Sequence, residues 1–549
     1  MCARHPHSRL RGGASLQTYE SLRREFRWDI PARYNIAVDT VDRHAAGRPN
    51  DPALILEDEG GPAARWSFSQ ISIASKQLAN AFAADGLAAG DRVAVLLGQS
   101  PETAIAHLAI YRSGLIAVPL FVLFGPDAIE FRLSDSGATA LITDVHNWPK
   151  VAEIRDRLPR LKSIFVVDGQ GIDGTLDFGD QVSAGSSRFQ PVDTRADDPA
   201  IIIYTSGTTG PPKGALHAHR FLLGHLPGVL LPHDFPPKPG DLFWTPADWA
   251  WIGGLYDVLF PAWHWGVPVV AHRARRFDPE RALDLMARHQ IRNVFLPPTA
   301  LKLIRGSGSE IPPTLHLRSV GSGGETLGVE LLEWGRQHLA VTINEFYGQT
   351  ECNLIVSNSA GLMDVRPGSM GRPVPGHEVA ILDDDGAVLP SDAIGEIAVR
   401  WPDPVMFLGY WNQPAATASK FSGDWMRTGD RGSADRDGYI WFHARADDVI
   451  TSGAYRIGPG EIEDCLLKHP AVAMVAVVGV PDPVRTQMIK AFVVPAKGVA
   501  PSDSLTSELQ DFVRTRLAAH EYPRAIEYIE ALPLTSTGKV MRRELRTRG

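Results

Sequence analysis

The chain has 549 residues and a formal net charge of −8, the balance of 55 Lys and Arg against 63 Asp and Glu. Hydrophobic residues make up 44% and charged residues 21%, which excludes a disordered chain, a coiled coil and a collagen-like repeat. The acidic balance argues against a nucleic-acid partner, because such proteins neutralise phosphates with excess Lys and Arg. The cysteines, Cys2, Cys352 and Cys465, lie too far apart in sequence for a disulfide framework or a CxxC metal site. They fit a reducing compartment, and we expect a cytoplasmic protein.

The sequence predicts no transmembrane segment. Its most apolar stretch, residues 113–126, is shorter than the roughly 20 residues that a spanning helix needs and contains Pro119. We expect a buried strand followed by a turn there. The first nineteen residues lack acidic groups and contain several arginines. These residues fit two interpretations, a transit peptide and a flexible tail. We favour the tail, because the segment has no apolar helix face.

Apolar runs alternate with amphipathic stretches along most of the chain, which is typical of parallel βα units. The predicted elements in this part are strands at 92–97, 140–144, 200–203, 268–271 and 293–296 and helices at 101–112, 127–136, 278–289 and 298–304. Beyond residue 379 the runs shorten, and 379–386 and 395–399 predict a small β-rich section. The last hundred residues predict an α+β unit, with strands at 475–480 and 489–494 and a helix at 504–518. We therefore expect an α/β fold, with a large multi-layer N-terminal domain over 1–446 (1–19 being the tail) and a small mobile α+β domain over 447–549.

The strongest motif follows the predicted strand 200–203 and reads YTSGTTGPPKG, residues 204–214. Its glycines allow backbone N–H groups to surround phosphate oxygens, and its hydroxyls add further donors. A glycine-rich surface hairpin is the alternative, but the density of hydroxyls and the final Lys213 favour polyphosphate binding. A Walker P-loop requires G-x-x-x-x-G-K-[ST], whereas Lys213 lies between Pro212 and Gly214, so that motif is excluded.

Two further loops carry polar groups. In YGQTE, residues 347–351, Thr350 suits a phosphate oxygen and Glu351 suits Mg2+, which prefers oxygen ligands. Tyr347 is placed to stack on a base. In TGD, residues 428–430, the carboxylate of Asp430 suits ribose hydroxyls. Each loop alone is a weak signal, because an acidic turn after a strand is usually just solvent-exposed.

The order of the motifs is more informative. YTSGTTGPPKG, YGQTE, TGD, RADD, YRIGPGEIE and TGK follow one another along the chain. This series resembles the adenylate-forming superfamily, which comprises acyl-CoA synthetases, nonribosomal adenylation domains and luciferases. The run from DDVI to YRIGPGEIE is most similar to the acetyl- and medium-chain acyl-CoA synthetase branch. The resemblance covers residue 51 to the C-terminus.

The resemblance implies a set of nucleotide-binding residues. The β- and γ-phosphates of ATP would be bound by Thr205, Ser206, Gly207, Thr208, Thr209, Gly210 and Lys213. The adenine and α-phosphate would be contacted by Gly323, Gly324, Glu325, Tyr347 and Thr350, with Glu351 holding Mg2+. The ribose would be bound by Asp430 and Arg445. The string GSGGET, residues 321–326, lacks the spacing and the later acidic residue of a dinucleotide fingerprint.

The resemblance also implies a mobile catalytic lysine. Lys539 would hold the carboxylate of the acid against the α-phosphate during adenylation only, a positioning and electrostatic role. Asp447 would be the hinge about which the C-terminal domain turns before CoA enters. No general base is required, because a carboxylate is already a nucleophile.

The predicted CoA channel departs from the pattern. Relatives usually carry Gly two positions before Arg456, a predicted catalytic residue, whereas this chain has Gly453-Ala454. Ala444 likewise replaces the usual Gly before Arg445. A methyl group in the channel at Ala454 makes thioester formation a less secure prediction than adenylation, although a shift at Gly453 is an alternative that relieves it.

The acid is the least determined substrate. Gly348 stands where acetate-specific members have Trp, so a pocket deeper than one for acetate is expected. Trp249 and Trp251, in a segment that resembles the acyl-pocket segment of the family, are candidate pocket residues, although plain core is equally consistent with them. Cys352 and Asn353 replace a usual Thr-Gly pair, and Cys352 is expected to be buried. His217 and His219 lack companion ligands, so core or surface placement is favoured over a metal site.

The expected function is ATP- and CoA-dependent activation of a carboxylic acid of medium-chain, branched or aromatic type through an acyl-AMP intermediate. One alternative is an enzyme that transfers the acyl group to the phosphopantetheine of a carrier protein. We favour it less, because the sequence predicts no attached carrier-like domain. Another is an inactive nucleotide-binding regulator, which the joint presence of Lys539, Glu351, Thr350 and Asp430 argues against. The expected partners are the small-molecule acid, ATP, CoA and Mg2+, with no nucleic acid, and a homo-oligomer is left open.

Overall fold

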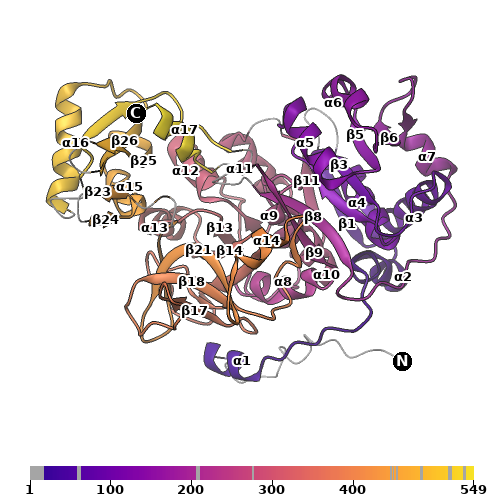
Figure 1. The fold of residues 1–549 in the computed structure, drawn as a ribbon, viewed down its shortest axis with the longest axis horizontal. Helices are drawn as coiled ribbons and strands as arrows, with labels where there is room; N and C mark the ends of the chain where they lie inside the picture. The colour runs from indigo at the N-terminus through magenta and orange to yellow at the C-terminus, as the bar shows by residue number, and fades with distance from the viewer. Residues whose placement is uncertain are drawn as a thin grey trace.

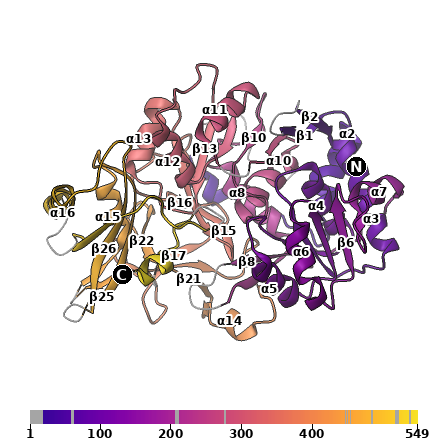
Figure 2. The ribbon, with the colours of Figure 1, turned by 90° about the horizontal axis from the view of Figure 1, so that it is seen from above.

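A computed structural model of the chain describes residues 18–57, 63–205, 211–274, 277–445, 448, 450–452, 455–482, 486–516, 522–535 and 539–548. Two bodies stand side by side in it (Figures 1 and 2), a large N-terminal domain and a small C-terminal domain. This arrangement confirms the expected fold class. The predicted domain boundary at 446 and 447 lies outside the described residues.

The first sheet of the N-terminal domain is mostly parallel. Over the described ranges it contains nine strands in the order β16 (Arg372–Pro373), β15 (Cys352–Ser357), β14 (Ile343–Gln349), β13 (Ser319–Gly323), β12 (Asn293–Phe295), β10 (Phe243–Trp244), β11 (Val269–His272), β1 (Pro52–Glu57) and β2 (Ala64–Ser67). Helices α11 (Pro279–Arg288), α12 (Pro298–Ser307) and α13 (Val329–His338) connect its strands, and their apolar sides close a core with it. Here the βα alternation predicted from the apolar runs is confirmed.

The second sheet faces the first across a shared core. Within the same ranges it has eight strands in the order β19 (Gly409–Tyr410), β9 (Lys213–Ala218), β8 (Pro199–Thr205), β4 (Ile116–Pro119), β3 (Arg92–Leu96), β5 (Ala140–Asp144), β6 (Ser163–Val167) and β7 (Leu176–Asp177). The helices that enter the shared core include α3 (Phe68–Ala84), α4 (Pro101–Arg112), α8 (Phe221–Leu230) and α10 (Phe260–Trp265). Helices α5 (Pro126–Ser136) and α6 (Trp148–Ile154) pack on the opposite face of this sheet.

Smaller helical elements complete the same domain. They are α1 (Tyr19–Glu25), a π-helical turn at Val38–Asp42, α2 (Arg43–Gly47), a 3-10 turn at Arg155–Arg157, α7 (Phe178–Ala184), α9 (Ile252–Gly254), a π-helical turn at Leu255–Leu259 and α14 (Pro414–Ala418). The predicted β-rich section after residue 379 is a third sheet of β17 (Val379–Leu382), β18 (Gly395–Arg400), β21 (Trp425–Ala434) and β20 (Phe421–Ser422), with β22 (Ile440–Arg445) paired to β21. It ends at the junction with the C-terminal domain.

The C-terminal domain has its own sheet and core. The sheet runs β24 (Tyr455–Ile457), β23 (Ile450–Ser452), β26 (Thr486–Pro495) and β25 (Val472–Asp482), with β27 (Ala525–Tyr528) parallel to β26. Helices α15 (Pro459–Leu466), α16 (Asp503–Arg516) and α17 (Arg542–Thr547) complete it. This is the α+β composition expected from the last hundred residues. No helix in the described part of the chain is long and apolar enough to span a membrane.

Candidate active site

The predicted nucleotide loops meet at strand ends. Strands β13 and β14 are neighbouring and parallel, with Gly323 opposite Phe346. The segments Gly323-Gly324-Glu325 and Tyr347-Gly348-Gln349-Thr350-Glu351 therefore leave the same edge of the first sheet. In open α/β sheets the carboxyl ends of the strands are the usual place for ligands.

The predicted phosphate loop is the tip of an antiparallel hairpin of the second sheet. Strands β8 and β9 pair up to Thr205 and Lys213, and the Thr205 hydroxyl donates to the Lys213 carbonyl at 3.4 Å. Ser206, Gly207, Thr208, Thr209 and Gly210 lie outside the described residues. Short antiparallel pairing fixes both stems of the loop, as phosphate binding would require.

Tyr410 connects this hairpin with the candidate Mg2+ carboxylate. The Lys213 ammonium lies 5.2 Å from the centre of the Tyr410 ring, and the Tyr410 hydroxyl donates to Glu351. Glu351 is buried, and Tyr410 is the one side chain among the described residues that hydrogen-bonds to its carboxylate. Among the described residues no group of three or more His, Cys, Asp and Glu could hold a metal. The donor set fits Mg2+ bound by one carboxylate together with substrate phosphates.

Asp430 lies at the centre of a hydrogen-bond network. Tyr347 donates its hydroxyl to Asp430 at 2.6 Å, and the Gln349 amide donates to the same carboxylate at 3.3 Å. Arg445, the cross-strand neighbour of Asp430 on β22, lies 3.6 Å away. Burial raises the pKa of Asp430, and the positive charges of Arg445 and Lys420 oppose that rise. The predicted ribose residues are thus adjacent to the predicted adenine residue Tyr347.

Lys420 is part of this network although sequence reasoning did not select it. Its ammonium donates to the Gln349 side-chain oxygen at 3.3 Å and to the Thr428 carbonyl at 3.2 Å. Gln349 in turn donates to the Thr428 carbonyl at 3.1 Å. Lys420 therefore holds the Gln349 amide in the orientation that serves Asp430.

Lys539 belongs to the C-terminal domain, yet it reaches the N-terminal site. An ideal Cβ placed on Gly324, whose φ is +92°, would lie 3.7 Å from Lys539 Cε and 3.2 Å from the ring of Trp251. A side chain at Gly324 would be strained at this φ and would crowd both neighbours. Glycine at this position leaves room for Lys539 and Trp251 to approach the loop.

The electrostatic surroundings of Lys539 come from the predicted nucleotide site. Partial loss of hydration next to the surrounding protein lowers the pKa of Lys539, and the positive charge of Arg445 lowers it further. The side chain nevertheless remains exposed to solvent. The carboxylates of Glu325, Asp430 and Glu351 act in the opposite direction. Lys539 therefore lies within electrostatic range of four predicted nucleotide residues.

The segment 324–328 is held from both domains. Thr299 donates to the Glu325 carboxylate at 3.0 Å, and the Leu327 N–H donates to Glu345 at 3.1 Å. From the C-terminal domain, Asp464 Oδ1 lies 3.4 Å from an ideal Cβ on Gly328. Burial raises the pKa of Glu345 to about 8 and that of Asp464 to about 6. Both carboxyl groups adjoin the loop against which Lys539 is placed.

The lysine loop is tied to the neighbourhood of the predicted hinge. Asp448 forms an ion pair with Arg546 at 2.6 Å and lies 3.8 Å from Arg542. Arg542 also donates to both oxygens of Glu463, at 2.7 and 2.8 Å. Helix α17 and the start of the C-terminal domain thus form one unit. The predicted hinge Asp447, the predicted channel residues Gly453 and Ala454, and the side chain of Arg456 lie outside the described residues.

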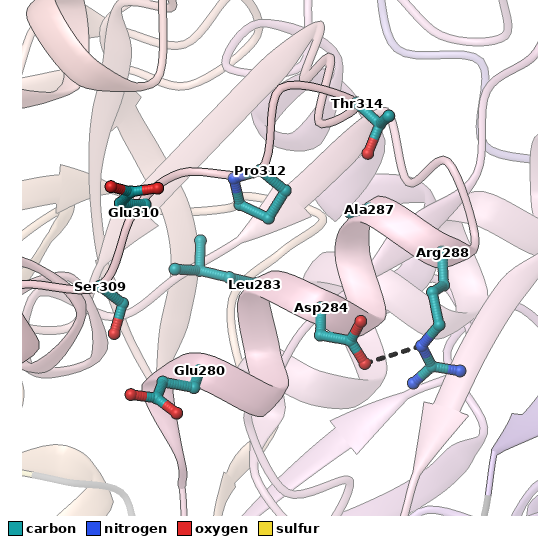
Figure 3. A pocket seen from close by; sticks show the side chains of 9 residues that line it. All are labelled: Glu280, Leu283, Asp284, Ala287, Arg288, Ser309, Glu310, Pro312 and Thr314. Atoms are coloured by element: carbon teal, nitrogen blue, oxygen red, sulfur yellow. Dashed lines mark hydrogen bonds and ion pairs between the residues drawn. The ribbon is translucent and has the colours of Figure 1, made fainter.

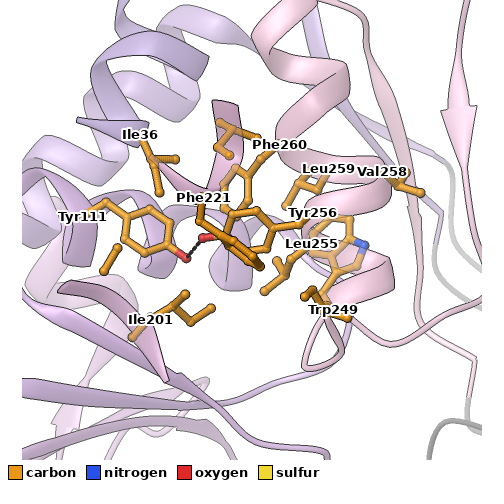
Figure 4. Close-up of a cluster of buried hydrophobic side chains, with 14 of the residues drawn as sticks. Ile36, Tyr111, Ile201, Phe221, Trp249, Leu255, Tyr256, Val258, Leu259 and Phe260 are labelled. Carbon is orange, nitrogen blue, oxygen red and sulfur yellow. Dashed lines mark hydrogen bonds between the residues drawn. The ribbon is translucent and has the colours of Figure 1, made fainter. Parts of the chain in front are cut away.

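The candidate acyl-pocket residues differ in their surroundings. Trp249 is fully buried in the core shown in Figure 4, next to Leu255 and Tyr256. Of the two readings left open for Trp249, this placement favours core packing, and its role in the acyl pocket stays a prediction. Trp251, by contrast, is partly exposed and adjoins Gly324, the glycine that Lys539 also approaches.

The structure gives a second reason for glycine at position 348, besides the deeper pocket that the sequence predicts. An ideal Cβ there would lie 2.4 Å from the Leu354 main-chain nitrogen and 2.7 Å from Asn353 Oδ1. The backbone of the next strand therefore occupies the space that a side chain would need. Absence of a side chain at Gly348 reflects this tight hairpin as well as any deepening of a pocket.

The remaining side chains singled out in the sequence are interior residues. Cys352 is fully buried, and burial raises the pKa of its thiol well above the usual value, so it stays protonated. His217 and His219 are also fully buried, and burial lowers the pKa of both rings. The expected buried role of Cys352 and the core placement of the two histidines are confirmed.

A cavity of about 420 Å³ lies apart from these loops, between α11 and residues 309–314. Its charged lining consists of Glu280, Asp284, Glu310 and Arg288, and Arg288 pairs with Asp284 at 2.7 Å (Figure 3). The net negative charge is unsuited to ATP or CoA. The strand-end loops are therefore the better candidate for nucleotide binding.

Comparisons with known proteins identify the family of the chain. The family model for AMP-binding enzymes matches residues 41–411, and the model for the AMP-binding enzyme C-terminal domain matches residues 461–539. The mitochondrial acyl-coenzyme A synthetase ACSM3 of Mus musculus is 36% identical over 97% of this chain and 93% of its own length. The acetyl-coenzyme A synthetase of Bacillus subtilis (strain 168) is 34% identical over 98% of this chain and 96% of its own length. The structure of the anthranilate CoA ligase AuaEII with anthranoyl-AMP superimposes with a TM-score of 0.86 at 31% identity, covering 95% of this chain and 98% of that one.

Proposed function

This chain belongs to the AMP-binding enzyme family and is an ATP-dependent acyl-CoA synthetase, and on that premise we propose that it activates a medium-chain, branched or aromatic acid in preference to acetate. The observation that supports this most is that Lys539 and Trp251 both approach Gly324, at 3.7 Å (Cε) and 3.2 Å (ring) from an ideal Cβ there. A lysine that would orient the carboxylate of the substrate thus approaches the same glycine as a large apolar ring. The rest of the acid would lie along Trp251.

ATP would be bound by the meeting strand ends. The hairpin that ends at Thr205 and Lys213 would surround the β- and γ-phosphates. Tyr347 would stack on adenine while its hydroxyl stays on Asp430, which lies beside Arg445 for the ribose hydroxyls. Glu351 would hold Mg2+, which supplies positive charge to the departing pyrophosphate when bound.

Adenylation would need positioning rather than a base. Lys539 would hold the carboxylate against the α-phosphate near Thr350 and offset the negative charge that develops. A carboxylate oxygen forms the new bond to the α-phosphorus, and the bond from that phosphorus to the bridging oxygen of pyrophosphate breaks. Lys539 would act through its positive charge and would transfer no proton in this step.

Thioester formation would follow a turn of the C-terminal domain about Asp447. This motion would withdraw Lys539 together with α17, because Arg542 and Arg546 tie that helix to Asp448. The CoA thiol would then lose its proton to solvent and its sulfur would attack the acyl carbonyl. The bond from that carbon to the phosphate oxygen of AMP would break, and AMP would leave. Ala454→Gly is expected to leave adenylation unchanged and to maintain or raise the rate of thioester formation. A selective fall in that second rate would contradict an obstructing methyl group.

A panel of acids tests the substrate class and the acceptor together. AMP release would be measured for acetate, octanoate, isovalerate and benzoate, with and without CoA. We expect CoA-dependent turnover that is faster with one of the larger acids than with acetate. Fastest turnover with acetate would refute the proposed class, and turnover that requires a carrier protein instead of CoA would refute the proposed acceptor.

The cellular location and the oligomeric state of the protein are addressed by separate proposals. We retain the cytoplasm, because three cysteines far apart in sequence fit a reducing compartment, although the mammalian relatives are named as mitochondrial. Fluorescence microscopy of the full chain would distinguish the two compartments. Light scattering of the purified protein would decide the oligomer.

A further inference from the structure

We propose that a cavity between the two domains, distinct from the nucleotide site, binds a small amphiphilic anion and so holds the C-terminal domain in its present position. This interdomain cavity has a volume of about 240 Å³. One wall is the end of α12 and the start of α13, and the other is α15 with residues flanking β25 and β26. Its volume is below the roughly 300–1,000 Å³ of drug-sized sites, so the ligand must be small.

The floor of the interdomain cavity is apolar. Leu327 and Leu331 contribute from the N-terminal domain and are 3% and 2% exposed. Leu467 and Val472 contribute from the C-terminal domain. These aliphatic side chains suit a short alkyl chain, which would gain by leaving water.

The rim of the interdomain cavity is positively charged. Lys302, Lys468 and Lys497 line it, and none of their ammonium groups makes a hydrogen bond or an ion pair within the described part of the chain. Within the described ranges, three other charged residues line the cavity. Arg305 and Glu330 form an ion pair at 2.8 Å, and Asp464 is the third. The lining therefore carries more positive than negative charge. An oxyanion head group on a short apolar tail is complementary to it.

The interdomain cavity is separate from the nucleotide site and depends on how the domains are placed. No predicted nucleotide residue is among its described lining residues. Asp464 of one domain approaches Gly328 of the other at its edge. Turning the C-terminal domain away would take half of the lining with it. A ligand that binds only the closed arrangement must stabilise that arrangement.

This linkage has a kinetic consequence. With the ligand bound, adenylation should continue while the turn needed for thioester formation is opposed. That consequence rests on the domain alternation proposed above, whereas binding to the cavity does not. The ligand would therefore act as an inhibitor of the second half-reaction alone.

The test is binding of hexyl phosphate and hexanesulfonate to the full-length protein by isothermal titration calorimetry. Neither carries a carboxylate, so neither is an acid substrate. We expect saturable binding of hexyl phosphate and none of hexanol or hexylammonium. If hexanesulfonate also binds, a monoanionic head group is sufficient for the site. If hexanesulfonate does not bind, the site requires a phosphate monoester.

Charge-reversal variants locate the site. Lys468→Glu and Lys497→Glu should each weaken hexyl phosphate binding about three- to tenfold, as the loss and reversal of one partly exposed charge would. Lys162→Glu, at an exposed lysine before β6, is the matched control and should bind as the unmodified protein does. No saturable binding, or equal affinity in all three variants, would overturn the proposal.

A kinetic comparison separates this site from the nucleotide site. Saturating hexyl phosphate should slow thioester formation from supplied acyl-AMP at least fivefold and leave acid-dependent pyrophosphate exchange unchanged. Equal inhibition of both reactions would place the ligand in the nucleotide site and overturn the proposal. If the protein without hexyl phosphate shows no pyrophosphate exchange with any acid, the proposed adenylation is contradicted. The calorimetric result on binding to the cavity would still stand.

Discussion

Lys539→Ala is the change with the most specific expected effect. The side chain of Lys539 makes no hydrogen bond or ion pair with the described residues. The bonds that hold its loop, from the Lys539 N–H to Thr535 Oγ1 at 3.0 Å and from the Thr535 N–H to the Lys539 carbonyl at 2.7 Å, use the main chain of residue 539. Alanine keeps both, so the free energy of unfolding should change by less than about 0.5 kcal/mol.

The expected loss is confined to the first half-reaction. Removal of one charge aimed at the developing transition state typically costs about 10²–10³ in rate, or roughly 3–4 kcal/mol. Acid-dependent pyrophosphate exchange should fall by that factor, because Lys539 is the cation placed between Gly324, Trp251 and the carboxylates of the site. Thioester formation from supplied acyl-AMP should remain largely intact.

The assay compares both half-reactions in the same preparation. Exchange of labelled pyrophosphate into ATP reports adenylation, and consumption of supplied acyl-AMP by CoA reports thioester formation. Lys162→Ala is the matched control, since it removes an exposed lysine outside the site. Equal loss of both half-reactions in Lys539→Ala would refute a lysine that acts in adenylation only.

Three further changes test other parts of the site. Burial raises the pKa of Glu345 from 4.5 to about 8, so the folded protein binds more protons than the unfolded chain in that window and its stability should fall as pH rises through it, by at most about 5 kcal/mol. Glu345→Gln should remove this decline in urea unfolding between pH 5 and pH 8, and an unchanged decline would assign it to other groups. Lys420→Met should raise the KM for ATP about tenfold through loss of the two hydrogen bonds that orient Gln349, with partial rescue by Lys420→Arg; a fall in kcat alone would contradict this positioning role. Gly348→Trp should lower AMP release with every acid, because its Cβ meets the Leu354 nitrogen at 2.4 Å, whereas a shift toward acetate without loss of rate would show that the hairpin accommodates the ring.

The sequence is informative about the site where function depends on loops that follow strands. The apolar strand before Thr205 and the one before Tyr347 predict where each loop begins. Parallel pairing of β13 with β14 brings Gly323 and Tyr347 to one edge of the first sheet, whereas Thr205 ends a strand of the second sheet. Element types were predictable for the same reason. Bounds were less so: within the stretch 379–386 of the predicted β-rich section the strand ends at Leu382, because the Asp383 carboxylate accepts from the N–H groups of Asp385 and Ala387 and forms a turn.

Partners that come from distant segments were not predictable. Tyr410 and Lys420 lie outside the motifs. Tyr410 is on β19 of the second sheet and Lys420 directly precedes β20 of the third, and only tertiary packing brings them to Glu351 and Gln349. The pair Trp249 and Trp251 shows the same limit. Composition does not distinguish them, and the turn that buries the first and turns the second toward Lys539 is a tertiary feature.

The most direct test of the central claim is a single-turnover experiment with ATP and the best acid of the panel. Without CoA, one equivalent of enzyme-bound acyl-AMP and one of pyrophosphate should appear, and addition of CoA should convert the acyl-AMP to acyl-CoA and AMP. Formation of ADP, or acyl-CoA without a preceding acyl-AMP, would contradict an adenylating acyl-CoA synthetase.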